Sequence, residues 1–365
     1  MRALIHENVP LAPLTTFGIG GAARYFVDAP DEDTVLESIR WAADKNLPLF
    51  ILGGGSNLLV ADAGFPGLVI KVGIKGIDLT TDNGKTIVRA GAGEEWDRLV
   101  TLAVERGLAG IECLSGIPGS VGGTPIQNVG AYGQEISQVL VSLRAYDREN
   151  DQIKELSHHE CGFTYRASLF NTVAKDRYVV LRVTFALTPN GAPAVRYPDV
   201  QREFQDQNGA PSLAEVRAAV RRIRLRKAML LMEGDPDCRS AGSFFKNPIM
   251  TEAQFDKLRS IAGPEVPRYP VGSAGGSSAP SGEGVGRIKT AAAWLIEQAG
   301  FSKGYSVGPV GLSTKHTLAL VNRGGATAED VLRLAREIHH RVQDRFGVSL
   351  LMEPVLLGFP KGVVF

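Results

Sequence analysis

The sequence predicts a protein of the α+β class that is built from at least two domains. Its 365 residues are more than a single hydrophobic core usually holds. In the first half, short apolar runs typical of strands alternate with helical patterns. The pattern changes near residue 190, where Asn190-Gly191-Ala192-Pro193 is typical of a connection. We therefore expect the domain boundary between about 190 and 225.

The first half is predicted to hold two helices among short strands. Apolar side chains recur at helical spacing over residues 35–43, and Asn46 with Pro48 ends that pattern. A second helix is expected over residues 96–103, with Gly107 where a C-terminal cap belongs. Short β-branched or apolar runs predict strands at 49–52, 68–72, 86–90, 139–146 and 178–187.

The second half is predicted to be richer in helices. Ser212 and Glu215 have the spacing of a capping box, which is typical of the start of a helix. Residues 272–286 are rich in Gly and Ser and predict a flexible surface loop. Apolar periodicity predicts further helices at 251–260, 290–299 and 328–346, the last with Thr327 as N-cap and Gly347 after its end.

Composition excludes several classes of protein. Lys and Arg number 40 and Asp and Glu number 39, so the charge gives no general attraction to nucleic acid or to an anionic membrane. Three widely spaced cysteines predict neither a disulfide framework nor a zinc site, and the pair His158-His159 is expected to be solvated. The first residues lack the apolar core of a signal peptide, and no apolar stretch approaches the roughly 18 residues of a membrane span. We expect a cytoplasmic protein without a metal.

A first candidate binding motif, Gly53-Gly54-Gly55-Ser56-Asn57, follows a predicted strand. Glycines let a backbone approach a ligand closely, and consecutive N–H groups can bind pyrophosphate oxygens. A tight turn at the end of the strand is the alternative interpretation. No Lys-Ser or Lys-Thr follows, so the motif is not a P-loop, and no glycine cluster has the full spacing of a Rossmann fingerprint.

A second candidate motif is the long run over residues 115–133, in which glycines and prolines are mixed with Ser, Thr, Gln and Asn. Such a composition disfavours regular structure, and a long irregular loop usually has a functional reason to exist. Its backbone amides could surround a flat, polar cofactor; a purely structural loop is the alternative.

Together with three further strings, these loops resemble the family of UDP-N-acetylenolpyruvoylglucosamine reductases. The further strings are residues 15–21, Tyr165-Arg166-Ala167-Ser168 and residues 241–248, and the similarity continues through residues 292–296 to the C-terminal helix. It covers nearly the whole chain. The resemblance implies a two-subdomain FAD-binding fold of the vanillyl-alcohol-oxidase (PCMH) type over residues 1–212, divided at about 72, and an α+β substrate domain over residues 213–365. The last residues are expected to pack back toward the flavin.

The resemblance also implies the ligands. FAD is expected to bind without a covalent bond, NADPH to serve as electron donor without a Rossmann domain, and a nucleotide sugar to be the substrate of a monomeric enzyme. The cofactor-binding residues that it implies are Gly53, Gly54, Gly55, Ser56, Asn57, Leu58, Pro118, Gly119, Ser120, Gly122, Gly123, Thr124, Asn128, Gly130 and Ala131.

Three residues match the catalytic positions of the family. Ser243 matches the proton donor, Arg166 the arginine that pairs with the substrate carboxylate, and Glu353 the assisting acid. The implied reaction reduces UDP-N-acetyl-3-O-(1-carboxyvinyl)-glucosamine to UDP-N-acetylmuramate for peptidoglycan synthesis. Two alternatives are a flavin oxidase of the same fold and a nucleotide-sugar-binding protein without catalysis. The implied substrate-binding residues are Tyr197, Lys227, Asn247, Tyr269, Lys303 and His316.

Overall fold

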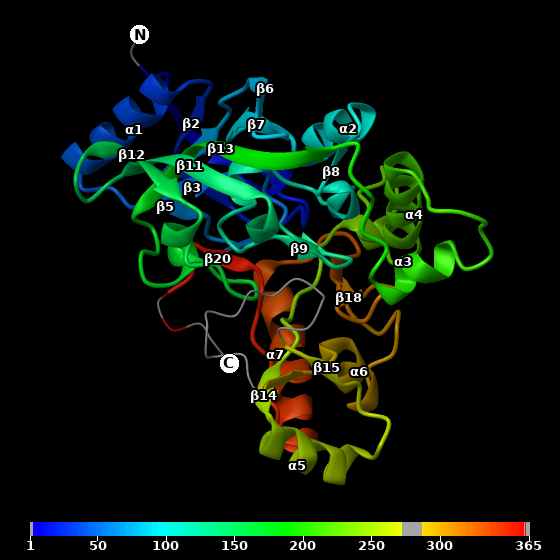
Figure 1. Ribbon diagram of the computed structural model, residues 1–365. Coiled ribbons are helices and arrows are strands. Elements are labelled where there is room, and N and C mark those ends of the chain that lie inside the picture. Colours follow the sequence, from blue (N-terminus) through cyan, green and yellow to red (C-terminus); the bar gives the residue numbers. More distant parts are fainter. Residues whose placement is uncertain (1–2, 272–286, 361, 363–365) are drawn as a thin grey trace.

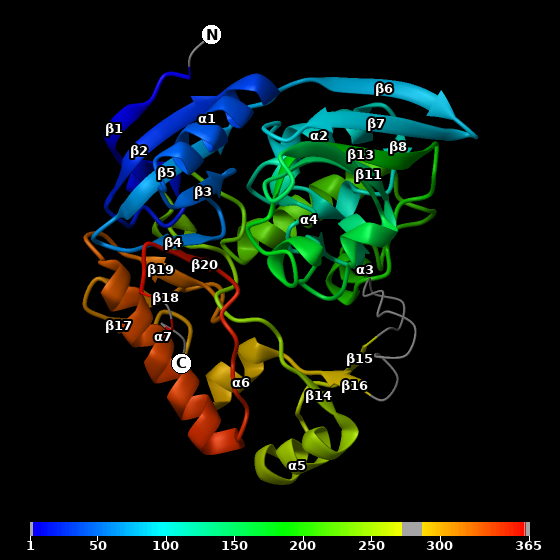
Figure 2. The same ribbon diagram turned by 90° about the vertical axis from the view of Figure 1, so that its left-hand side faces the viewer.

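The computed structural model describes residues 3–271, 287–360 and 362. Two sheets lie above a smaller C-terminal domain of helices and short strands (Figure 1 and Figure 2), and the predicted α+β class is confirmed. The predicted flexible loop at 272–286 lies outside the described residues. Among the described residues, no helix combines the length and the apolar character needed to cross a membrane.

The first sheet combines one antiparallel pair with a parallel core. Its strand order is β1-β2-β5-β3, and β2, β5 and β3 run parallel. The predicted first helix is confirmed as α1, and the side chain of Asp31 accepts a hydrogen bond from the Thr34 N–H at 2.8 Å, which caps it. The bounds are β1 (His6–Pro10), β2 (Ala22–Ala29), α1 (Glu32–Asp44), β3 (Leu49–Leu52) and β5 (Phe65–Val72).

The second sheet is antiparallel and shares a core with the first. Its order is β12-β11-β13-β7-β6, and β8 pairs with the end of β13. Trp96 of α2 is buried against Phe185, and its indole N–H donates to the Leu114 carbonyl at 3.0 Å, just before the second glycine-rich loop. The bounds are β6 (Ile77–Asp82), β7 (Lys85–Gly91), α2 (Trp96–Glu105), β8 (Leu108–Ala109), β11 (Leu140–Asp147), β12 (Gln152–Ser157) and β13 (Tyr178–Pro189).

Helices α3 (Pro198–Glu203) and α4 (Leu213–Arg226) lie beside the second sheet. The predicted capping box between Ser212 and Glu215 is present at the start of α4. The apolar face of α4 is buried with Cys113, Tyr132 and Val200. Because α4 packs on residues of the first domain, a domain boundary after α4 agrees better with this core than the predicted boundary between residues 212 and 213. The domain limits stay a proposal.

The C-terminal domain has a core of its own around α7. The predicted caps of α7 are confirmed: Thr327 forms a capping box, and Gly347 adopts φ 67° at the end of the helix. Phe17, Ile19 and Leu59 from the N-terminal part join this core. The bounds are β14 (Ile249–Thr251), α5 (Glu252–Ala262), β15 (Tyr269–Pro270), β16 (Arg287–Lys289), α6 (Ala292–Gln298), β17 (Ser306–Val307), β18 (Val310–Leu312), β19 (Leu320–Asn322) and α7 (Ala328–Phe346).

Two short pairings complete the fold near the glycine-rich loops. The last strand, β20 (Val355–Leu357), runs parallel to β4 (Leu58–Val60), which begins directly after the first loop. The end of the second loop forms β9 (Gly130–Ala131), which pairs with β10 (Gln134–Glu135). Figure 2 shows β20 and β4 side by side where the C-terminal domain meets the first sheet.

Candidate active site

The two glycine-rich loops lie against each other. The Ser56 hydroxyl donates to the Pro118 carbonyl at 3.0 Å. A Cβ atom at Gly54 would lie 2.5 Å from the Cα of Gly119, so only glycine permits this approach of the two backbones. At Gly123, by contrast, an added Cβ would meet only the Ser120 hydroxyl oxygen, at 3.7 Å. The exposed backbone at Gly123 is thus open to a ligand, and the two bare loops fit a flat cofactor such as FAD.

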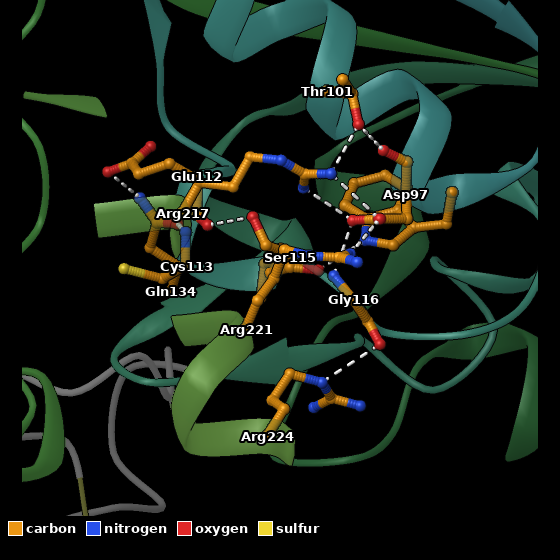
Figure 3. Close-up of polar contacts among 12 residues, drawn as sticks. Asp97, Thr101, Glu112, Cys113, Ser115, Gly116, Gln134, Arg217, Arg221 and Arg224 are labelled. Atoms are coloured by element: carbon orange, nitrogen blue, oxygen red, sulfur yellow. Dashed lines mark hydrogen bonds and ion pairs between the residues drawn. The ribbon is translucent and has the colours of Figure 1, made fainter. Parts of the chain in front are cut away.

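A network of charges anchors the start of the second loop (Figure 3). The Gly116 N–H donates to a carboxylate oxygen of Asp97 at 2.6 Å, and Arg217 donates to both oxygens of the same carboxylate at 2.7 and 3.0 Å. Arg221 adds a third charged contact at 2.7 Å, and the Arg224 guanidinium donates to the Gly116 carbonyl at 3.1 Å. Burial opposes ionisation of Asp97, but its hydrogen bonds to Arg217 and Gly116 hold its pKa below the ordinary value.

Side-chain hydrogen bonds also fix the far end of the second loop. Gln134 donates to the Glu112 carboxylate at 2.8 Å and accepts from the Cys113 N–H at 2.7 Å (Figure 3). Asn128 is buried, and its amide group donates to Glu135 and to the Thr164 carbonyl, both at 3.1 Å. Since this side chain is engaged within the protein, a contact between Asn128 and FAD would involve the backbone.

Arg166 and Glu353 form an ion pair beside the first loop. The Arg166 Nε lies 3.2 Å from a carboxylate oxygen of Glu353. Burial by itself would lower the pKa of Arg166, but Glu353, Tyr165 and Glu135 together outweigh burial and raise that pKa. The Asn57 amide group donates to the Gln127 side chain at 2.9 Å and to the Glu353 carbonyl at 3.3 Å, so it connects both loops to the acid.

Ser243 reaches the same place through a short backbone pairing. Phe245 pairs with Met352 as an isolated β-bridge, and the Glu353 N–H donates to the Phe244 carbonyl at 2.9 Å. Ser243 directly precedes this contact and is partly exposed. Its hydroxyl makes no hydrogen bond to another described residue. The structure thus pairs Arg166 with Glu353 and places the residue after Ser243 against the Glu353 backbone, so three distant parts of the chain meet here.

The predicted substrate residues form two neighbouring groups. In the first, the Lys227 ammonium lies 2.6 Å from Asp199, and the rings of Tyr132 and Tyr197 meet edge to face at 5.5 Å. Burial raises the pKa of Tyr197 to about 12, with contributions from Asp199 and Tyr269. Tyr197 and Tyr269 nevertheless remain 42% and 48% exposed, so they can contact a ligand.

In the second group, His316 lies near the charges of Lys227 and Lys303, whereas Asn247 lies near Tyr165. Burial lowers the pKa of His316 to about 4, and the charges of Lys227 and Lys303 contribute, so this imidazole is neutral near pH 7. The Asn247 side-chain oxygen accepts from the Ala292 N–H at 2.9 Å, at the start of α6. Burial raises the pKa of the nearby Tyr165, and the Asn247 side chain counteracts part of that rise.

Sequence reasoning missed three polar residues of this region. Gln127 connects to Asn57, as described above. Glu135 is buried, and burial raises its pKa to about 7. The Lys289 ammonium lies 4.8 Å from the centre of the Tyr165 ring. Gln127 lies in the long polar loop and Glu135 follows it, so the loop composition could have indicated both. Lys289 lies in a three-residue strand without a recognisable motif.

Comparisons with known proteins agree with this arrangement. The model of an FAD binding domain matches residues 23–157, and the model of the UDP-N-acetylenolpyruvoylglucosamine reductase C-terminal domain matches residues 235–357. The crystal structure of the reductase MurB from Thermus caldophilus superposes with a TM-score of 0.62, at 27% identity, over 98% of this chain and 99% of that one.

Two proteins named UDP-N-acetylenolpyruvoylglucosamine reductase are similar over nearly their whole length. The one from Thermobifida fusca is 49% identical over 98% of this chain and 99% of its own. The one from Streptomyces coelicolor is 48% identical over 96% of this chain and 90% of its own. With this identity over both chains and with the site described above, the chain belongs to the UDP-N-acetylenolpyruvoylglucosamine reductase family.

Proposed function

We propose that the protein is a monomeric, cytoplasmic enzyme that uses NADPH and bound FAD to reduce UDP-N-acetyl-3-O-(1-carboxyvinyl)-glucosamine to UDP-N-acetylmuramate. The observation that carries this proposal is the meeting of Arg166, Ser243 and Glu353 at the junction of the two glycine-rich loops. The two glycine-rich loops would hold FAD, which would supply the hydride chemistry that links NADPH to the vinyl group of the substrate.

The protein's own residues would bind the substrate and complete the reduction. Arg166 pairs with the carboxylate and stabilises the negative charge that develops on the adjacent carbon. Glu353, 3.2 Å from Arg166, holds the guanidinium in place. Ser243 gives its hydroxyl proton to that carbon, which converts the vinyl group to the saturated lactyl ether.

The remaining predicted residues suit the nucleotide-sugar part of the substrate. Lys227 and Lys303 are point charges appropriate for diphosphate oxygens, and Asp199 keeps Lys227 oriented before the ligand binds. The exposed rings of Tyr197 and Tyr269 offer flat surfaces for a base or a sugar. Cofactor contacts are assigned to the two loops, mainly through their backbones.

The test runs the two half-reactions separately and without oxygen. NADPH should bleach the flavin absorbance of the purified protein, and the enolpyruvyl nucleotide sugar should then restore it. Failure of that substrate to restore the absorbance, together with rapid reoxidation once oxygen is admitted, would instead favour an oxidase of the same fold. A protein that shows neither reaction but binds the nucleotide sugar would be the non-catalytic alternative.

A further inference from the structure

Lys289 lies between the catalytic group and the exposed tyrosines. It is the last residue of β16, where it pairs with Ile249 on β14 and with Tyr269 on β15. Residues directly opposite in an antiparallel ladder project from the same face, so Lys289 and Tyr269 share a face of this small sheet. The Lys289 ammonium and the Arg166 guanidinium both lie by the Tyr165 ring, at 4.8 and 5.7 Å from its centre.

The two cations differ in their partners. Arg166 has Glu353 at 3.2 Å, whereas the Lys289 ammonium makes no ion pair and donates no hydrogen bond within the part of the chain that the structure describes. Glu135 is the carboxylate that favours the charged form of Lys289, but burial raises the pKa of Glu135 to about 7, so it is only partly ionised near neutral pH. The group therefore carries a positive charge that Glu353 and Glu135 do not fully balance.

Keeping a half-buried ammonium without a close anion is unfavourable. Burial lowers the pKa of Lys289, and the charge of Arg166 lowers it further. An apolar side chain of similar length would avoid this cost. The arrangement is accounted for if an anionic ligand group completes it when the ligand binds.

We propose that Lys289 binds the carboxylate of the enolpyruvyl group, as a second cation next to Arg166. This proposal rests on the proposed function, which supplies the carboxylate. Two features favour the carboxylate over the diphosphate. The Lys289 ammonium lies by the Tyr165 ring, and the charges of Arg166 and Glu135 affect its pKa, so it belongs with the catalytic group. The charges of Lys227 and Lys303 instead lower the pKa of His316, so these two lysines lie in the other group. Arg166 already shares its charge with Glu353, so a second cation strengthens the hold on the carboxylate.

The test compares two ligands that differ in the carboxylate. UDP-N-acetylmuramate carries it on the lactyl ether, whereas UDP-N-acetylglucosamine has the same nucleotide and sugar without it. Affinities are measured by titrating the oxidised, FAD-loaded enzyme and following the flavin spectrum or the heat of binding. Lys289→Met should weaken UDP-N-acetylmuramate about 10- to 100-fold, the usual worth of a charge-assisted hydrogen bond, and leave UDP-N-acetylglucosamine unchanged.

Matched variants separate this role from a structural one. Lys289→Arg should keep most of the affinity for UDP-N-acetylmuramate, and Lys257→Met, which removes an exposed lysine of α5, should change neither affinity. Lys289→Gln, a polar replacement of similar length, repeats the measurement if the Met variant does not fold. Equal losses for both ligands would assign Lys289 to the diphosphate and overturn the proposal, as would no loss for either.

The proposed function is checked in the same preparation. If NADPH-reduced wild-type enzyme is not reoxidised by the enolpyruvyl substrate, the proposed function itself is wrong. If wild type is reoxidised but Lys289→Met binds the two ligands as wild type does, only the role of Lys289 is refuted.

Discussion

Asp97 should be the residue whose loss most disturbs the second glycine-rich loop from outside it. Its carboxylate holds Arg217, Arg221 and the Gly116 N–H at 2.6 to 3.0 Å. Asp97→Ala leaves two arginines and one backbone donor without this acceptor. The Asp97 and Arg217 side chains are only 20% and 15% exposed, so solvent replaces the lost contacts incompletely.

The size of the effect follows from this burial. Removing one partner of a buried ion pair typically costs about 3–5 kcal/mol. With roughly 2 °C per kcal/mol for a chain of this size, the unfolding midpoint should fall by about 6–10 °C. Because Gly116 begins the cofactor loop, the affinity for FAD should fall as well, whereas loss of a distant surface charge would affect neither.

The assay is thermal unfolding of the apoprotein together with titration of FAD into it. Asp256→Ala, which removes an exposed carboxylate of α5, is the control and should change neither quantity.

The pH dependence of the unfolding midpoint gives a second readout. The pKa of Asp97 is depressed in the folded protein, so its contribution is complete above the unfolded pKa and is lost as pH falls through the folded value. Asp97→Ala should therefore lose less stability than wild type as the pH falls through this range. An unfolding midpoint and an FAD affinity equal to those of wild type would refute the anchoring role.

Three further predictions concern the cofactor and the proton donor. Gly123→Val should lower the flavin content of a folded protein, because the new side chain would enter the space assigned to FAD without meeting the rest of the protein. Gly55→Val should instead lower stability, because its Cβ would lie 1.9 Å from the Leu14 carbonyl oxygen. Absorbance at the flavin band measures the first effect, and thermal unfolding measures the second. Acid precipitation should release the flavin into the supernatant, because the two cofactor loops contain no His or Cys, and flavin left on the polypeptide would contradict this. Ser243→Ala should leave reduction by NADPH unchanged and slow reoxidation by the enolpyruvyl substrate about 10²- to 10⁴-fold in anaerobic stopped flow, while Ser243→Cys keeps part of the rate; slower reduction with normal reoxidation would exclude Ser243 as proton donor.

The elements with a strong periodic pattern could be predicted from the sequence. The predicted helix at 328–346 coincides with α7, because a continuous apolar stripe and both caps mark it. Strands β1 and β6 were missed, because they are short and mostly exposed and therefore lack an apolar pattern. The packing of α4 on the second subdomain was also not predictable, since its apolar face does not specify its partner.

The residues of the candidate site also fall into those that the sequence could indicate and those that it could not. Strings of several residues, such as the two glycine-rich loops, are long enough to be recognised. A single polar residue is not: Lys289 gains its meaning only when β15 and β16 pair and its ammonium comes to the Tyr165 ring. Glu135 follows a recognisable string, but its raised pKa depends on burial that no local pattern indicates.

The position of Glu353 makes the site depend on docking of the two domains. Its backbone N–H is bound by Phe244, and its carbonyl is bound by Asn57 of the first loop. The next residues pair as β20 with β4, so the segment that carries the acid bridges the FAD-binding part and the C-terminal core. Arg166 comes from a third segment, where Thr164 and Ala167 close a tight turn and Arg166 itself adopts φ 54°, a conformation that non-glycine residues rarely hold unless their surroundings impose it. A loss of the β20–β4 pairing should therefore move Glu353 away from Arg166, although neither glycine-rich loop has changed. Ser243 should move with Glu353, because the neighbouring Phe244 carbonyl accepts the Glu353 N–H.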